Sequence, residues 1–216
     1  MVNSVATAAL LGREAKQGAV SVRDVPGHLL RAVFAMLIRD GLLLCLFLLP
    51  QWPLTGIAPL MVLGSMAVIT GLLTFFVERS GRGRRQPPLP HRLLRSPLAL
   101  RSVGGFGLLF SLLFVLSGLA KQFFGASGLL LVVIAGALAS TASSSVLLGQ
   151  QLTAGAISGI IAASAMWLVA LVGLMENAII FWITSSQSAP VGRLFLFYIP
   201  ILFAGGFVVI LASLLR

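Results

Sequence analysis

The sequence predicts an all-α, polytopic membrane protein with about six transmembrane helices and a short half-helix at the N-terminal end. Hydrophobic residues make up 58% of the chain and charged residues only 9%, whereas about a quarter of a soluble domain is charged. The apolar residues also gather in runs that can cross a bilayer, which takes roughly 20 residues each. A chain of this kind lacks the polar surface to face water on all sides.

The half-helix and the spans follow one another in order. Residues 1–12 are apolar but short, and as a helix they reach about halfway across a bilayer at about 1.5 Å per residue. The full spans are predicted at residues 29–50, 55–77, 102–120, 129–149, 153–184 and 194–215. Turns are predicted at Pro50-Gln-Trp-Pro53 and at Phe123-Phe-Gly-Ala-Ser-Gly128. Prolines at positions 87, 88 and 90 exclude regular structure from the linker at residues 79–101.

The net charge of +10 is concentrated in that linker. Such clustering between apolar runs is typical of cytoplasmic loops and of contact with anionic lipid headgroups, and it argues against a nucleic-acid-binding module. We therefore expect the linker and both chain termini in the cytoplasm, with only Lys121 and Arg193 on the other side. The linker arginines are Arg79, Arg82, Arg84, Arg85, Arg92, Arg95 and Arg101.

Two short segments that resemble each other lie 137 positions apart. Each has three polar residues at positions i, i+1 and i+4, which share one face of a helix, followed by a Leu-Leu-Gly sequence. The aligned residues are Asn3, Ser4, Thr7 and Gly12 in the first segment and Ser140, Thr141, Ser144 and Gly149 in the second. Internal repeats are common in transporters. Because both segments would end at the cytoplasmic face, the repeats are predicted to be parallel, related by an axis along the membrane normal.

The repeats are expected to divide the chain into residues 1–78, with the half-helix and two spans, and residues 102–216, with four spans. The linker at 79–101 separates them. The second polar segment follows a full span, and the first follows none. The first repeat is then either truncated, or its span comes from a partner chain in a homo- or hetero-oligomer or from a larger parent protein.

Polar residues inside the apolar runs are candidates for a substrate path. The hydroxyl-rich stretch at 140–145 either packs helices closely or lines a polar path in a broken helix. Arg39 and Asp40 either face the protein interior at mid-membrane or mark a helix boundary at the interface. Glu176 and Asn177 lie at an outer boundary or inside a tilted helix, where the carboxylate would bind a cation or a proton, or neutralise Arg39. The full candidate set is Asn3, Ser4, Thr7, Arg39, Asp40, Ser140, Thr141, Ser143, Ser144, Ser145, Glu176 and Asn177.

Arg39 is the most informative candidate. It is expected to point into the protein and to be bound by Glu176, Asp40 or hydroxyls of residues 140–145. A variant Arg39→Met that removes a path-lining charge is expected to be at least as stable as the parent.

No catalytic, cofactor or metal site is predicted. The chain has no Ser/His/Asp grouping, no phosphate-binding glycine loop and no carboxylate pair suited to hydrolysis. Cys45, His28 and His91 stand apart from one another, so no metal-type cluster arises.

Several short motifs resemble a known family. They are Val2-Asn-Ser-Val-Ala-Thr7, Met36-Leu-Ile-Arg39, Ser96-Pro-Leu-Ala-Leu-Arg101, Phe106-Gly-Leu-Leu-Phe110 and Phe124-Gly-Ala-Ser-Gly128. Together they are similar to the C-terminal integral-membrane domain of unknown function that follows the MgtC/SapB domain in bacterial proteins, here as a stand-alone chain. The resemblance implies a bacterial inner-membrane protein suspected of transport. Residues 140–145 lack the family's acidic residues, and no lysine follows Asn177 before Arg193.

These features favour a transporter or channel subunit that moves a small solute or ion between the two hydroxyl-rich helices. Arg39 favours an anionic or carboxylated substrate, because a fixed cation raises the local anion concentration. The alternative is a non-transporting scaffold or regulatory partner of another membrane complex. A membrane-embedded enzyme acting on lipid is a third interpretation, and it lacks a nucleophile–base pair.

Overall fold

The computed structural model describes residues 4–18, 20–21, 24–48, 57–81, 100–186 and 189–215, and in these ranges the regular structure is entirely helical. The all-α class is therefore confirmed. The helices are α1 (Ser4–Lys16), α2 (Val25–Leu48), α3 (Ile57–Gly81), α4 (Leu100–Ala139), α5 (Thr141–Thr153), α6 (Gly159–Ser185) and α7 (Ala189–Leu214). Asn3, the predicted turn at 50–53 and residues 82–99 of the predicted linker lie outside the described residues.

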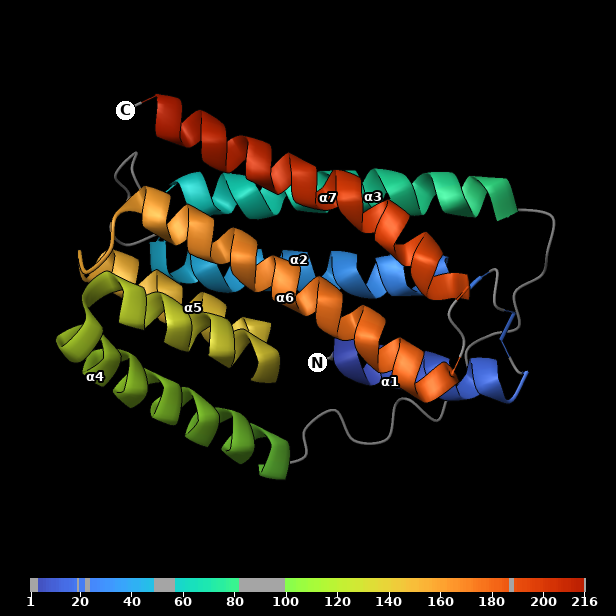
Figure 1. Cartoon of the computed structure of the whole chain (residues 1–216), viewed down its shortest axis with the longest axis horizontal. Helices are drawn as coiled ribbons and strands as arrows, with labels where there is room; N and C mark the ends of the chain where they lie inside the picture. Colours follow the sequence, from blue (N-terminus) through green and yellow to red (C-terminus); the bar gives the residue numbers. More distant parts are fainter. Residues whose placement is uncertain are drawn as a thin grey trace.

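Four long helices, α2, α3, α6 and α7, lie side by side along the longest axis of the molecule (Figure 1). We call the end of this bundle where α1, α3 and α6 finish and α2 and α7 begin end A; it is on the right in Figure 1. At the opposite end, end B, α2, α5 and α7 finish and α3 and α6 begin. The short helices α1 and α5 therefore begin toward the middle of the bundle and run outward to opposite ends.

Three helical segments are long and apolar enough to cross a membrane, namely Ile57–Arg79, Gly159–Ser185 and Pro190–Leu214. Large apolar side chains on their outer faces, such as Phe76, Ile183 and Phe203, are exposed, as is expected where lipid is the solvent. These segments suggest a membrane protein. The predicted count of about six spans is not confirmed, because only these three described segments are long and apolar enough. Helix α2 carries charges in its middle, and the apolar helix Ser127–Ala139 is short.

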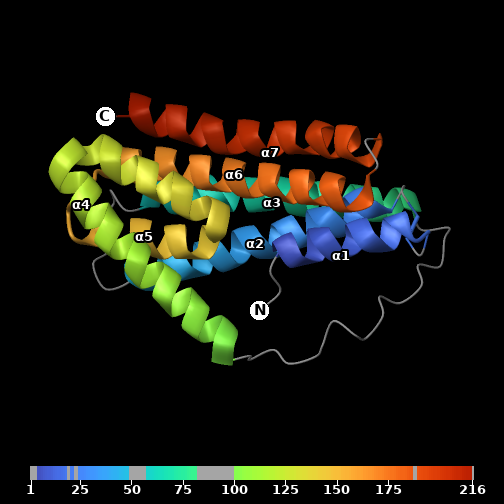
Figure 2. The same ribbon diagram turned by 60° about the horizontal axis from the view of Figure 1, so that its bottom comes forward.

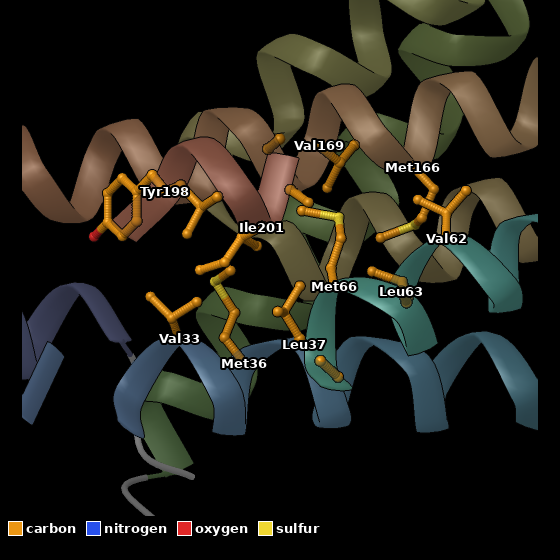
Figure 3. Packing of buried hydrophobic residues seen from close by; sticks show 14 of the residues in the cluster. Val33, Met36, Leu37, Val62, Leu63, Met66, Met166, Val169, Tyr198 and Ile201 are labelled. Carbon is orange, nitrogen blue, oxygen red and sulfur yellow. The ribbon is translucent and has the colours of Figure 1, made fainter. Parts of the chain in front are cut away.

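The apolar core lies between the four long helices (Figure 3). Met36 and Leu37 of α2 face Met66 of α3, Val169 of α6 and Ile201 of α7, and all five are buried. Methionine has three rotatable bonds and fills the irregular spaces between crossing helices. The core thus holds α2 and α6 in fixed positions, and these are the helices that carry the polar pairs.

The predicted span at 129–149 consists of two helices that fold back on each other. Ser140 is extended, with φ −167° and ψ 112°, and its hydroxyl accepts a hydrogen bond from the Ser143 backbone N–H at 3.2 Å. The Ser144 hydroxyl donates to the Val133 carbonyl oxygen at 2.8 Å, which ties α5 to the second half of α4. The hydroxyl-rich stretch thus breaks a helix, as the broken-helix interpretation predicted.

A second turn divides α4 itself. Gly125 has φ +61° and ψ −147°, a conformation that residues with a Cβ rarely adopt. The two halves of α4 form a V, seen on the left in Figure 2. This turn lies inside the one predicted at residues 123–128. The second half of α4 and α5 together make a helical hairpin whose tip is Ser140.

The two short helices run in opposite directions. Gly12 of α1 packs against Phe181 and Thr184 of α6, and Gly149 of α5 packs against Phe47 and Leu44 of α2. Both helices have 13 residues. Residue numbers rise together along α1 and α6, and also along α5 and α2. Since α2 runs from end A to end B and α6 runs back, α1 and α5 are antiparallel.

The prediction of parallel repeats is therefore wrong, and the repeated helices are inverted. The error has a physical origin in the hairpin at Ser140. If residues 129–149 crossed the bundle once, both copies of the motif would run the same way. Because the chain turns back at Ser140 instead, every later helix is reversed relative to the prediction.

The reversal also changes which segments share an end of the bundle. Helix α3 finishes at end A and α7 finishes at end B, so Arg79 and Leu214 lie at opposite ends. The prediction that the linker and both termini share one side is incompatible with this arrangement. Arg193, predicted to lie opposite the linker, begins α7 at end A together with Arg79. Helix α1 begins near the middle of the bundle (Figure 1).

Candidate functional site

An ion pair lies in the middle of α2. The Nε and Nη2 atoms of Arg39 both donate to Oδ1 of Asp40, at 2.9 and 2.8 Å. The Asp40 side chain is 2% exposed and that of Arg39 is 23% exposed. Adjacent helix residues point about 100° apart at 3.6 residues per turn, but the long arginine side chain bends back to reach its neighbour. The pair is thus inside the helix and not at a helix boundary.

Helix α5 begins beside this pair. Arg39 Nη2 also donates to the hydroxyl of Thr141, the first residue of α5, at 3.0 Å. The N-terminus of a helix carries partial positive charge and favours nearby anions, so it adds to the stabilisation of the Asp40 carboxylate. Of the predicted partners of Arg39, Asp40 and a hydroxyl of residues 140–145 are found, and Glu176 is not.

The first turn of α1 also contacts the middle of α2, on the side of end A, whereas α5 lies on the side of end B. The Ser4 hydroxyl contacts Met36 Sδ at 3.5 Å. A Cβ on Gly173 of α6 would lie 2.8 Å from Thr141 Cγ2 and 3.2 Å from Met36 Sδ. Only glycine therefore fits at position 173. The starts of α1 and α5 and the central parts of α2 and α6 converge around Met36.

The convergence follows the repeat. Positions that differ by 137 in the sequence make corresponding contacts. Ser4 contacts Met36, and Thr141, which is equivalent to Ser4, packs against Gly173, which is equivalent to Met36. The same offset pairs Arg39 with Glu176 and Asp40 with Asn177. The two polar pairs are thus equivalent positions of an inverted repeat. Extending the motif alignment without gaps into the neighbouring helices would have revealed this relation, and also the roles of Met36 and Gly173.

The second polar pair lacks the ionic partner of the first. Asn177 is fully buried; its Nδ2 donates to the Gly173 carbonyl at 2.8 Å, and its Oδ1 has no partner in the described part of the chain. Glu176 is partly buried, nine residues before the end of α6, and makes no hydrogen bond or ion pair with the residues that the structure describes. It is therefore inside the helix and not at its boundary.

The hydroxyls of residues 140–145 have different tasks. Ser140 caps α5, Ser144 joins α5 to α4, and the Ser145 hydroxyl donates to the Thr141 carbonyl at 2.8 Å. Ser143 is different, because its Oγ is fully buried and has no hydrogen-bond partner among the residues that the structure describes. A buried hydroxyl left without a hydrogen bond costs about 1–3 kcal/mol, and such a group calls for an explanation.

Thr7, one turn after Ser4, is partly buried on α1 and has an interaction partner. Other buried oxygens without a partner lie outside the convergence, on Glu14, Gln150 and Tyr198. In the described part of the chain, no three His, Cys, Asp or Glu side chains gather as a metal site would require.

The fold and site define an all-α protein with membrane-type helices, in which two short helices of opposite direction begin at the middle of α2, one of them at its ion pair. The chain belongs to the family named "Domain of unknown function (DUF4010)", whose model matches residues 1–185. The matched range contains α1 to α6 and therefore every residue of the convergence. No curated protein and no solved structure matches the chain.

Proposed function

We propose that this chain is a membrane transporter or channel subunit that binds a small solute or ion where α1 and α5 begin. One observation carries the proposal: two short helices of opposite direction start on the middle of α2, α5 at the ion pair of Arg39 and Asp40 and α1 at Met36, one turn before Asp40. At about 1.5 Å per residue, the 13-residue α5 is about 20 Å long and shorter than a bilayer core, which is about 30 Å thick.

Discontinuous helices suit this task. Their free N-terminal N–H groups and positive dipole ends can bind a substrate, and inverted repeats place such ends near the bilayer midplane in several transporter folds. Non-helical backbone such as that at Ser140 is tolerated at membrane depth only where protein or a water-filled cavity surrounds it. The same residues that break the helix therefore supply the polar groups.

The charges support a functional role as well. A charged residue at the centre of a membrane helix costs about 2.5–3.5 kcal/mol on insertion scales. Leucine at position 39 would avoid that cost, so a chain with only 9% charged residues is expected to keep an arginine there for a purpose. A role in substrate binding supplies one.

Localisation in a bacterial inner membrane follows from the same proposal and from the likeness to the membrane domain that accompanies MgtC/SapB domains. We assign end A to the cytoplasm on the Lys/Arg asymmetry. Helix positions at or near end A carry Arg13, Lys16, Arg31, Arg79 and Arg193. Lys121 lies four residues before Gly125 in the sequence, and α4 turns back at end B (Figure 1). Residues 1–78 and 102–216 are then inverted repeats joined by a cytoplasmic linker.

A scaffold or regulatory partner of another membrane complex is the second candidate. It is favoured by the completeness of the central contacts, because Arg39, Asp40 and Thr141 satisfy one another. A set of hydrogen bonds that only holds α5 against α2 would have the same geometry.

Water access separates the two candidates. Single cysteines at Thr141 and Ser143, in a Cys45→Ala background, are treated in membrane vesicles with a charged, membrane-impermeant thiol reagent applied from each side. Thr70→Cys is the matched control, because Thr70 is fully buried in α3 and bonded to the Met66 carbonyl. A transport protein exposes positions 141 and 143 to the reagent from at least one side while position 70 stays protected. Equal protection of all three positions would contradict the transport proposal and favour the scaffold.

A further inference from the structure

We propose that the Asp40 carboxylate occupies the position of the substrate, and that a small oxyanion of the carboxylate type binds Arg39 and the start of α5 when Asp40 takes up a proton. The inference rests on the proposed transport function and names its substrate class and its coupling. Anion and proton would then bind and move together.

The geometry around Arg39 selects the chemistry of the ligand. Two guanidinium N–H groups converge on a single carboxylate oxygen of Asp40. A planar fork of donors matches a carboxylate or a similar oxyanion better than any neutral group. A free oxyanion could accept the same two hydrogen bonds if the Asp40 oxygen withdrew.

A second, independent feature lies in the first turn of α5. The Ser143 hydroxyl is fully buried without a hydrogen-bond partner, three residues after the helix cap. A hydroxyl can donate to an anion, and the N-terminus of a helix also favours one. An oxyanion that reaches Ser143 from the start of α5 would give this hydroxyl the acceptor that it lacks among the described residues.

The charge balance near Arg39 requires the proton. Asp40 is the only ionic partner of Arg39 among the described residues. Helix α5 has no charged residue, and the remaining charges of α1, α3 and α7 (Arg13, Glu14, Lys16, Glu78, Arg79 and Arg193) lie toward end A. Glu176 is the one other carboxylate on α2 and α6, and it makes no ion pair with the described residues.

If an anion replaced Asp40 at Arg39 while Asp40 stayed ionised, a buried carboxylate would lose its cation, which is strongly unfavourable. A proton from solution that binds the displaced Asp40 carboxylate removes this cost. Arg39 stays cationic throughout and exchanges one anionic oxygen for another. The site gains one proton and one anion, so its net charge does not change.

The experiment uses the purified full-length chain in lipid nanodiscs, with acetate as the probe. Acetate binding is measured by titration, and proton uptake is followed with a pH indicator in weakly buffered solution. The chains compared are the parent, Asp40→Asn, Arg39→Met and the control Glu78→Gln. Glu78 forms an exposed ion pair with Arg31 at 2.7 Å, far from α5. Asparagine resembles a protonated aspartate in shape and charge, so Asp40→Asn should bind without taking up a proton.

The parent is expected to take up close to one proton per acetate bound at pH 7.5 and to bind at least tenfold more tightly at pH 5.5. Asp40→Asn should bind acetate at pH 7.5 at least tenfold more tightly than the parent, with no proton uptake. Arg39→Met should not bind, and Glu78→Gln should behave as the parent. If the parent and Asp40→Asn bind equally weakly, or if binding takes up no proton, the inference fails. Reagent access at positions 141 and 143 would still stand on its own, so the two proposals can fail separately.

Discussion

Gly12 and Gly149 occupy equivalent positions in two inverted halves of the molecule, and each lets a short helix touch the long helix of the other half. A Cβ on Gly12 would overlap the Thr184 side chain and lie 3.1 Å from the Phe181 carbonyl oxygen. A Cβ on Gly149 would lie 3.1 Å from Phe47 Cβ. Close approach of helices at small residues is a common basis of membrane helix packing. The two glycines therefore set where the starts of α1 and α5 lie relative to the central ion pair.

Gly12→Ala is expected to destabilise the protein by about 1–3 kcal/mol, because the added methyl group forces α1 away from α6. The change is measured as a lower Tm of the purified protein in detergent. Gly64→Ala is the matched control, since a Cβ there meets nothing within 4 Å; it should leave Tm unchanged or raise it. Adding Thr184→Ala to Gly12→Ala should restore part of the loss. An unchanged Tm for Gly12→Ala would show that α1 does not pack as described.

Gly149→Ala is expected to cost less than Gly12→Ala. The contact at position 149 is with a Cβ at 3.1 Å and ring or methyl carbons at 3.3 and 3.4 Å, which a small shift of the Phe47 side chain can relieve. The expected loss is about 1 kcal/mol, at the lower limit for overpacking. A loss of stability larger than that of Gly12→Ala would contradict the finding that the contacts at position 12 are closer than those at position 149.

Ser143→Ala and Ser144→Ala should have opposite effects on stability. The Ser143 hydroxyl has no partner, so its removal is expected to be neutral or stabilising; the Ser144 hydroxyl bonds the Val133 carbonyl, and its loss should cost about 1 kcal/mol. If Ser143 contacts a substrate, Ser143→Ala keeps its Tm and loses acetate binding. A Ser143→Ala variant that unfolds more easily would assign the hydroxyl a structural bond instead.

Arg39→Met is expected to be destabilised, by about 3–5 kcal/mol, because it leaves the buried Asp40 carboxylate without its cation. The expectation from the sequence alone was the opposite, namely a variant at least as stable as the parent. The double variant Arg39→Met/Asp40→Asn removes both charges and should recover most of the loss. Thermal unfolding of both variants and of Asp40→Asn gives the coupling free energy. Additive effects in the double variant would show that the two side chains do not form a pair.

The helical class could be predicted from the sequence, and the break at the hydroxyl-rich stretch was one of the two interpretations left open there, because both depend on local chemistry. Long apolar runs with few charges form membrane-type helices, and Ser140 competes for backbone N–H groups and caps a helix. The end of the first helix at Lys16 was likewise indicated by the charges at Arg13, Glu14 and Lys16, which end its apolar run.

The direction of the repeat could not be predicted in the same way. Side-chain patterns show which positions correspond, and they are the same for parallel and inverted copies. Direction depends on how often the chain crosses the bundle, and one hairpin at Ser140 changes that number. The roles of Met36 and Gly173 were also hidden, because an apolar residue and a glycine in an apolar helix look like ordinary packing. They stand out only when the polar pairs that follow them three and four residues later are aligned with each other.

The most direct test of the inverted arrangement is the sidedness of the two loops that follow the short helices. Gln17 follows α1 at end A and Ala154 follows α5 at end B, and both are exposed. Each is replaced by cysteine in a Cys45→Ala background and labelled with a membrane-impermeant maleimide in intact cells and in inside-out vesicles. The account predicts that Ala154→Cys reacts in intact cells and Gln17→Cys only in inside-out vesicles. Labelling of both cysteines from the same side would contradict the inverted repeat and, with it, a site formed where the two short helices meet.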